Sequence, residues 1–115
     1  MGDPAGIGPE TIARVVVEQP GLLSQLVVCG DAAVMSRALS LVGSDPALSA
    51  GRPVLAVISS VADAASAPPG TLVLWQACEP PGDVPDGQVS AVAGRAAAAC
   101  VVAAAGEVLA GRGRA

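Results

Sequence analysis

The sequence predicts an α/β fold with three layers, in which a mostly parallel sheet lies between flanking helices. Three short runs of apolar residues, at 26–29, 54–58 and 71–75, lack the polar alternation of a half-exposed strand. Such uninterrupted runs are typical of parallel strands buried on both faces. Stretches with helical spacing of apolar residues separate or follow these runs, as in strand–helix–strand units.

The first ten residues predict a stiff loop that starts a helix. They contain three glycines and two prolines. Gly2, Gly6 and Gly8 permit positive φ or a close backbone approach. Pro9 suits the first position of a helix, because its missing N–H would have no partner there. Glu10 then falls in the first turn, where the helix dipole favours an acid.

The remaining elements follow from apolar spacing and from turn residues. We predict a helix over 11–19, with Ile12, Val15 and Val16 on its apolar face, and a second helix over 32–41, with Val34, Ala38 and Leu41 facing inward. The other expected segments are strands at 26–29, 54–58 and 71–75, connections at 44–53, 59–69 and 79–87, a long helix over 91–109 and a frayed tail at 111–115. The expected inward side of the long helix is Ala97, Cys100, Val101, Ala104 and Val108.

Composition limits the classes of function. The formal net charge is −4, the six cationic residues are scattered arginines, and Trp75 is the single aromatic residue. We therefore expect no nucleic-acid partner. We also expect no membrane partner, because the longest apolar run, 96–105, is short and rich in alanine. The three cysteines lack a pairing pattern, which favours reduced, buried thiols and a cytoplasmic location.

Histidine is absent, so the commonest general base and metal ligand is missing. Asp3 and Glu10 either bind a metal or act as an acid–base pair, or they have structural roles only. In the structural interpretation, Asp3 makes a hydrogen bond within the loop and Glu10 complements the helix dipole. Asp31 follows a strand, so it serves either as an N-cap or as a ribose acceptor. Arg95 meets either a phosphate or solvent. The cysteines act either as nucleophiles or as small apolar residues.

Residues 2–10, Gly-Asp-Pro-Ala-Gly-Ile-Gly-Pro-Glu, resemble the amino-terminal signature of the 4-hydroxythreonine-4-phosphate dehydrogenase family. The wider isocitrate and isopropylmalate dehydrogenase group has a shorter relative of this loop. Two further segments resemble the family in the same order along the chain. These are the Val-Val-Cys-Gly-Asp turn at 27–31 and a Gly-x-x-Ser-x-x-x-Gly segment that begins at Gly87.

This resemblance implies an incomplete isocitrate/isopropylmalate dehydrogenase-like fold over residues 1–115, without its first strand and its carboxy-terminal two thirds. The complete family protein would be a homodimer. It would use NAD and a divalent metal (Zn, Mg or Co) to oxidise and decarboxylate a phosphorylated hydroxy acid in pyridoxal phosphate (vitamin B6) biosynthesis. A related threonate or erythronate 4-phosphate dehydrogenase is equally compatible.

By the same resemblance, Gly6, Ile7 and Gly8 would form part of the NAD pocket, although these residues equally suit a purely structural loop. The resemblance transfers no catalytic residue and no metal ligand to this chain. We therefore expect the 115 residues alone to be inactive. Two other outcomes stay open: a non-catalytic α/β module for nucleotide binding or subunit interaction, and a barely folded product with an unpaired sheet edge.

Overall fold

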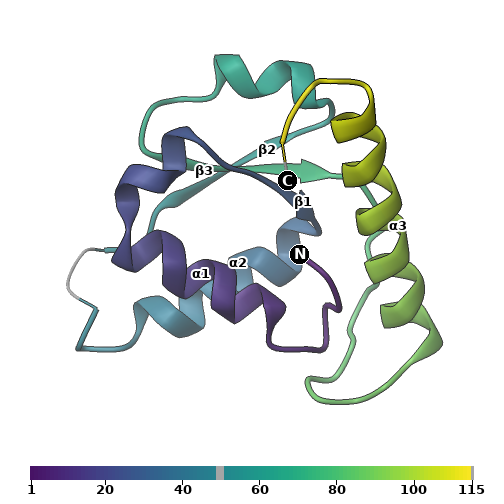
Figure 1. The fold of residues 1–115 in the computed structure, drawn as a ribbon. Helices are drawn as coiled ribbons and strands as arrows, with labels where there is room; N and C mark the ends of the chain where they lie inside the picture. The colour runs from purple at the N-terminus through teal and green to yellow at the C-terminus, as the bar shows by residue number, and fades with distance from the viewer. Residues whose placement is uncertain (49–50, 115) are drawn as a thin grey trace.

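The predicted α/β class is confirmed by a computed structural model, which describes residues 1–48 and 51–114 (Figure 1). Three parallel strands form one sheet in the order β1-β3-β2, so the last strand in the sequence is the central one. The elements in chain order are α1 (Gly8–Glu18), the 3₁₀ helix η1 (Pro20–Ser24), β1 (Val27–Gly30), α2 (Ala32–Gly43), β2 (Val54–Ile58), the 3₁₀ helix η2 (Val61–Ser66), β3 (Thr71–Gln76) and α3 (Ala91–Leu109).

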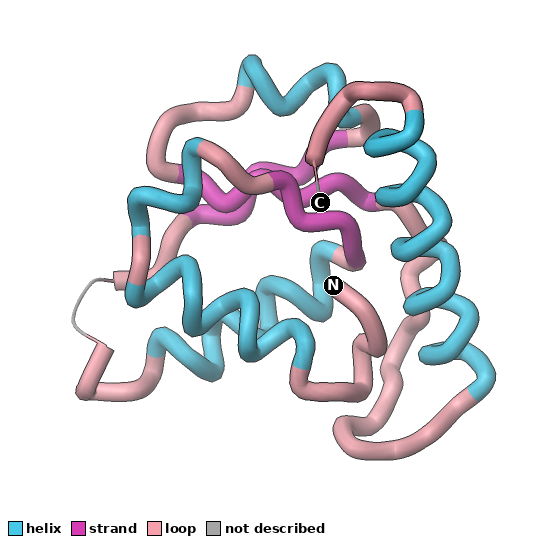
Figure 2. The backbone as a smooth tube through the Cα atoms, in the orientation of Figure 1, coloured by secondary structure: helices cyan, strands magenta, loops and turns pink. Residues whose placement is uncertain are grey.

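The predicted strands and helices all form, with ends shifted by at most a few residues. The segment 59–69 was predicted as loop, but it contains η2 (Figure 2). The Ser60 hydroxyl accepts a hydrogen bond from the Ala62 N–H at 3.3 Å, which caps the start of this short helix. Residues 49 and 50 of the predicted connection and residue 115 of the predicted tail lie outside the described residues.

One face of the sheet packs against α1 and α2 and forms the main core. Alternate residues of a strand point to opposite faces, so Leu72 and Leu74 share this face with Val28. These side chains meet apolar residues of both helices and of η1. The buried cluster consists of Ala13, Val16, Leu23, Val28, Met35, Ala38, Leu39, Leu72 and Leu74.

The predicted inward faces of α1 and α2 are partly wrong. Leu41 is 61% exposed and Val15 is 37% exposed, although both were placed inward. Val17 of α1 is buried, and α2 buries Met35 and Leu39. Helix α2 contacts both α1 and β2, so it needs a wider apolar stripe than a single line of residues would give.

Helix α3 contacts β1 and stands at the right of the molecule in Figure 1. Only Ala93, Ala96 and Cys100 of this helix are buried. Val101 and Val108 were predicted to face inward, but they are 63% and 37% exposed. By length and composition alone, α3 is long and apolar enough to cross a membrane, and 17% of its most apolar stretch is buried. The expectation of no membrane partner therefore stays a prediction.

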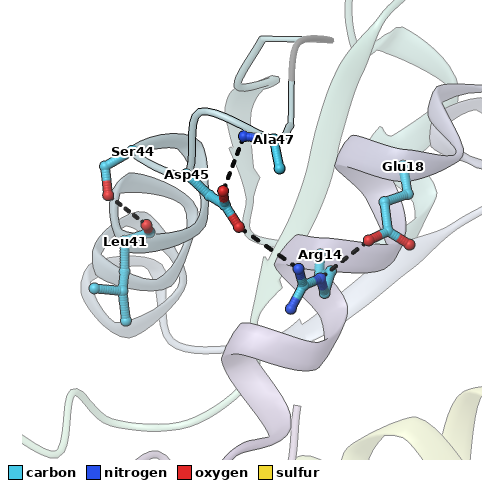
Figure 3. A network of polar contacts seen from close by, with 6 residues as sticks. All are labelled: Arg14, Glu18, Leu41, Ser44, Asp45 and Ala47. Atoms are coloured by element: carbon cyan, nitrogen blue, oxygen red, sulfur yellow. Dashed lines mark hydrogen bonds and ion pairs between the residues drawn. The ribbon is translucent and has the colours of Figure 1, made fainter.

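A polar network joins α1 to the end of α2 (Figure 3). The Arg14 guanidinium pairs with Glu18 at 3.0 Å and with Asp45 at 3.6 Å. Asp45 also accepts a hydrogen bond from the Ala47 N–H at 2.9 Å. These side chains are largely exposed, so the network orients the chain after α2 and adds little to stability.

Candidate functional site

The candidate site lies at the carboxyl ends of β1 and β3, where ligands bind in open parallel sheets. The chain start reaches this edge, because the Met1 ammonium donates a hydrogen bond to the Cys29 carbonyl oxygen at 2.8 Å. The glycine loop that follows Met1 leads directly into α1. Strand geometry thus brings the loop, the turn after β1 and the end of β3 together.

At two of the three loop glycines, the backbone geometry explains why the residue is glycine. Gly2 has a φ of 80°, which side chains rarely adopt. A Cβ on Gly8 would lie 2.5 Å from the Met1 carbonyl oxygen, so only glycine fits. Gly6 has neither a positive φ nor a comparable clash. Asp3 closes the loop, because its Oδ1 accepts from the Ala5 N–H at 2.8 Å, as the loop interpretation predicts.

Ile7 is an exposed apolar side chain of this loop. It occupies the N-cap position of α1, where it supplies no side-chain hydrogen bond to the helix. Its side chain is 83% exposed. The Pro9 ring lies within the first turn and is buried. An apolar side chain beside an uncapped helix start suits a ligand that carries both a flat apolar ring and an anionic group.

A second segment, the connection 79–87, packs against the glycine loop. The connection 79–87 was predicted as wholly exposed, but Val84 is only 6% exposed and packs with Ala5 and Ala93. The Gly87 N–H donates to the Ala5 carbonyl oxygen at 2.8 Å. The prediction failed because one valine among prolines, glycines and acids gives no periodic signal. This contact joins the start of α3 to the candidate loop.

Asp31 serves as the N-cap of α2, as predicted. Its Oδ1 accepts from the Val34 N–H at 2.9 Å, and its Oδ2 accepts from Gln76 Nε2 at 3.0 Å. The carboxylate is 2% exposed, so these partners replace solvent. The same Gln76 side chain accepts from the Ala32 N–H at 2.9 Å. The alternative in which Asp31 binds a ribose would require that network to open.

Gln76 was missed by sequence reasoning. It binds Asp31, Ala32 and the Cys78 carbonyl oxygen, and so ties the end of β3 to the turn after β1. The available signal was a polar residue directly after the apolar run 71–75. A polar side chain at that point of a parallel strand lies at the ligand-binding edge of the sheet.

The described residues contain no group of three or more His, Cys, Asp or Glu side chains that could hold a metal ion. Glu10 lies in the first turn of α1, as predicted, and its Oε2 is buried without a hydrogen-bond partner. Arg95 is exposed and lines an open cavity with Cys78. The residues present therefore do not fit a metal site by themselves.

The three cysteines, which are distant in sequence, lie close together. Burial raises the pKa of Cys29 and of Cys100, and it raises the pKa of Cys78 to about 11. A thiol with a raised pKa holds little thiolate at neutral pH, so it is a poor nucleophile there. This agrees with the interpretation of the cysteines as small apolar residues.

One curated relative gives a direct comparison. The chain is 41% identical over 96 residues to D-threonate 4-phosphate dehydrogenase of Bordetella bronchiseptica (strain ATCC BAA-588 / NCTC 13252 / RB50). The match covers 82% of this chain and 25% of that relative, so the chain spans about a quarter of the relative's length. No family model and no solved structure matches the chain.

Proposed function

Because this chain belongs to the 4-hydroxythreonine-4-phosphate dehydrogenase family, we propose that it supplies the cofactor-binding loop of a dehydrogenase for a phosphorylated hydroxy acid. The observation that carries the proposal is the exposed Ile7 at the uncapped start of α1. D-threonate 4-phosphate is the first substrate to test, because the relative is named for it.

The proposed cofactor is NAD, which accepts a hydride from the substrate when it is bound. Ile7 would pack against an apolar ring of the dinucleotide. The backbone N–H groups of Gly8 and Glu10, on either side of Pro9 in the first turn of α1, would face a phosphate. Gly8 keeps the loop close to the Met1 backbone, so it fixes where Ile7 stands. Gly6 would allow the ligand to approach the backbone, since a Cβ there meets only Asp3, at 3.4 Å or more.

The remaining features of the complete protein belong to the same proposal. They are a divalent metal (Zn, Mg or Co), decarboxylation after oxidation, a role in pyridoxal phosphate biosynthesis, a homodimer and a cytoplasmic location. A metal would need ligands beyond this chain, because the described residues offer no suitable group of three. Turnover would therefore require a longer protein, and we expect none from the isolated chain.

The decisive experiment places this chain in a complete enzyme. The matching segment of the Bordetella bronchiseptica relative is replaced by the aligned part of this chain, and NADH formation from D-threonate 4-phosphate is followed by absorbance. We expect turnover, and we expect Ile7→Asp to raise the KM for NAD by about tenfold or more, because a charge then replaces the apolar contact.

The matched control is Val89→Asp, since Val89 is likewise an exposed apolar residue but lies outside the glycine loop. It should leave the KM for NAD unchanged. An Ile7→Asp chimera with the KM of the unsubstituted chimera would overturn the role of Ile7. A folded chimera without turnover, or turnover by the isolated chain, would contradict the wider proposal.

A further inference from the structure

The face of the sheet that does not pack against α1 and α2 carries an open cavity. Cys29 of β1 lies beside Trp75 of β3 in the register of the sheet. Alternate residues of a strand point to opposite faces, so both side chains point away from the core residues Val28 and Leu74. The cavity over them has a volume of about 330 Å³, and Val61 of η2 and the carboxy-terminal half of α3 form its walls.

The tail after α3 turns back and lines the same cavity. It was predicted to be frayed over 111–115, but residues 111–114 follow a hydrogen-bonded turn. Gly111 has a φ of 74°, and the Arg112 N–H donates to the Glu107 carbonyl oxygen at 2.9 Å, which is a Schellman turn. Figure 1 shows this yellow segment running from the end of α3 back towards the sheet. Arg114 is thereby placed on the lining of the cavity.

The lining of the cavity carries an excess of one positive charge. The Arg112 guanidinium pairs with both carboxylate oxygens of Glu107, at 2.7 and 2.9 Å, so these two charges cancel. The hydrogen bond to Arg112 lowers the pKa of Glu107, and burial raises the pKa of Cys29, so the carboxylate stays ionised and the thiol stays neutral. Arg114 is the remaining charged group of the lining, in a chain whose formal net charge is −4.

The walls of the cavity suit a flat apolar ring. Trp75, the single aromatic residue of the chain, donates from its indole N–H to the Ser59 carbonyl oxygen at 3.1 Å, which fixes the orientation of the indole. Val61 and Val108 add branched apolar side chains to the same lining. An aromatic ring packs favourably against an indole, and a guanidinium binds a carboxylate through two N–H groups. The volume lies at the lower end of the range for small-molecule sites.

We propose that this cavity binds a small, flat aromatic carboxylate, with its ring against Trp75 and Val108 and its carboxylate on Arg114. The site is separate from the proposed cofactor loop, because its lining lies on the sheet face opposite α1. Binding here therefore does not depend on NAD or on the role of Ile7.

Trp75 provides a direct test, because a chain with one tryptophan gives one indole N–H signal in a nitrogen–proton correlation spectrum. The isotope-labelled chain is titrated with indole-3-acetate, a two-ring carboxylate, and separately with its uncharged counterpart indole-3-ethanol. We expect a saturable shift of the Trp75 signal with the carboxylate. The alcohol should bind about tenfold more weakly, because it lacks the charged contact with Arg114.

Matched variants locate the site. Val108→Asp and Arg114→Ala should each raise the Kd for indole-3-acetate by about tenfold, because they place a like charge in the cavity or remove the cation. Val101→Asp and Arg95→Ala make the same changes on α3 outside this cavity and should leave the Kd unchanged.

The proposal is overturned if the Trp75 signal shows no saturable shift, or if the carboxylate and the alcohol bind equally well. It is also overturned if Arg95→Ala weakens binding as much as Arg114→Ala does. Should the spectrum show that Val108→Asp is unfolded, Arg114→Ala decides the question, because Arg114 is exposed and its truncation leaves the core intact.

Discussion

Helices α2 and α3 are both rich in apolar residues, yet they differ in how many of their apolar side chains are buried. α2 has 12 residues and buries Val34, Met35, Ala38 and Leu39. α3 has 19 residues and buries only Ala93, Ala96 and Cys100. Its large residues Val101, Val102 and Leu109 are 63%, 72% and 88% exposed. Apolar composition therefore predicts a helix, whereas the neighbouring elements decide how much of it is buried.

The two helices also differ in the kind of contact that holds them. α2 meets α1 and the sheet through branched and long side chains, which bury much apolar area each. α3 contacts β1 through Cys100 and contacts the glycine loop and Val84 through Ala93. These small side chains bury little apolar area each. The stability of the chain should therefore depend much more on α2 than on α3.

The sharpest test of this difference is a pair of truncations. Leu39→Ala in α2 should lower the free energy of unfolding by about 2 to 5 kcal/mol, because it leaves a cavity in the main core. Val101→Ala in α3 should change it by less than about 0.5 kcal/mol, because the side chain is exposed. Urea unfolding measures both, and equal losses would break the comparison.

The N-caps of the two helices give a second test. Asp31→Ala should cost about 2 kcal/mol, because it removes the cap of α2 and also removes one of the two acceptors of the half-buried Gln76 amide, which keeps its bond to the Cys78 carbonyl oxygen. Ser90→Ala should cost about 1 kcal/mol, since Ser90 Oγ only accepts from the Ala93 N–H at 3.1 Å. Thermal and urea unfolding should rank the variants in this order. Asp31→Asn, which keeps an acceptor, serves as the control.

Gly94 of α3 and Gly43 of α2 test how much space for a side chain each helix has at its glycine. A Cβ on Gly94 of α3 would meet no atom within 4 Å, so Gly94→Ala should stabilise the chain by about 0.5 to 1 kcal/mol. A Cβ on Gly43, at the end of α2, would lie 3.4 Å from Arg52 Cβ, so Gly43→Ala should give a smaller gain. A loss of stability in Gly94→Ala would show that α3 is more closely covered than the structure indicates.

A further test concerns the pH dependence of stability, and its effect is confined to alkaline pH. The pKa of Cys78 is raised from 9.0 to about 11 by burial and by its hydrogen bond with Cys100. The protonated thiol is favoured in the folded state, so its contribution is complete below about pH 9 and is lost as the pH rises to about 11. Cys78→Ser should unfold with a shallower dependence on pH in this interval. Identical profiles would contradict the burial of this thiol.

Much of the fold follows from local sequence patterns. The apolar runs 54–58 and 71–75 predict β2 and β3, and Asp31 and Ser90 predict the starts of α2 and α3. These signals are local, because strand burial and capping depend on residues within a few positions.

The features that sequence reasoning missed depend on contacts between distant residues. Val84 is buried only because Ala5 and Ala93 meet it, and Gln76 matters because its amide reaches Asp31. The convergence of the cysteines likewise requires β1 and α3 to be placed side by side. In the candidate site, Gly6, Ile7 and Gly8 were named from the loop motif, and their binding role stays a prediction.

The strand order has a consequence for how the chain is made. β1 and β2 do not pair with each other, and both pair with β3. Within the residues that the structure describes, neither β1 nor β2 has a partner strand before Thr71–Gln76 has been synthesised. Until then, the segments of β1 and β2 remain unpaired. This delays folding and leaves two apolar segments exposed to association with other chains.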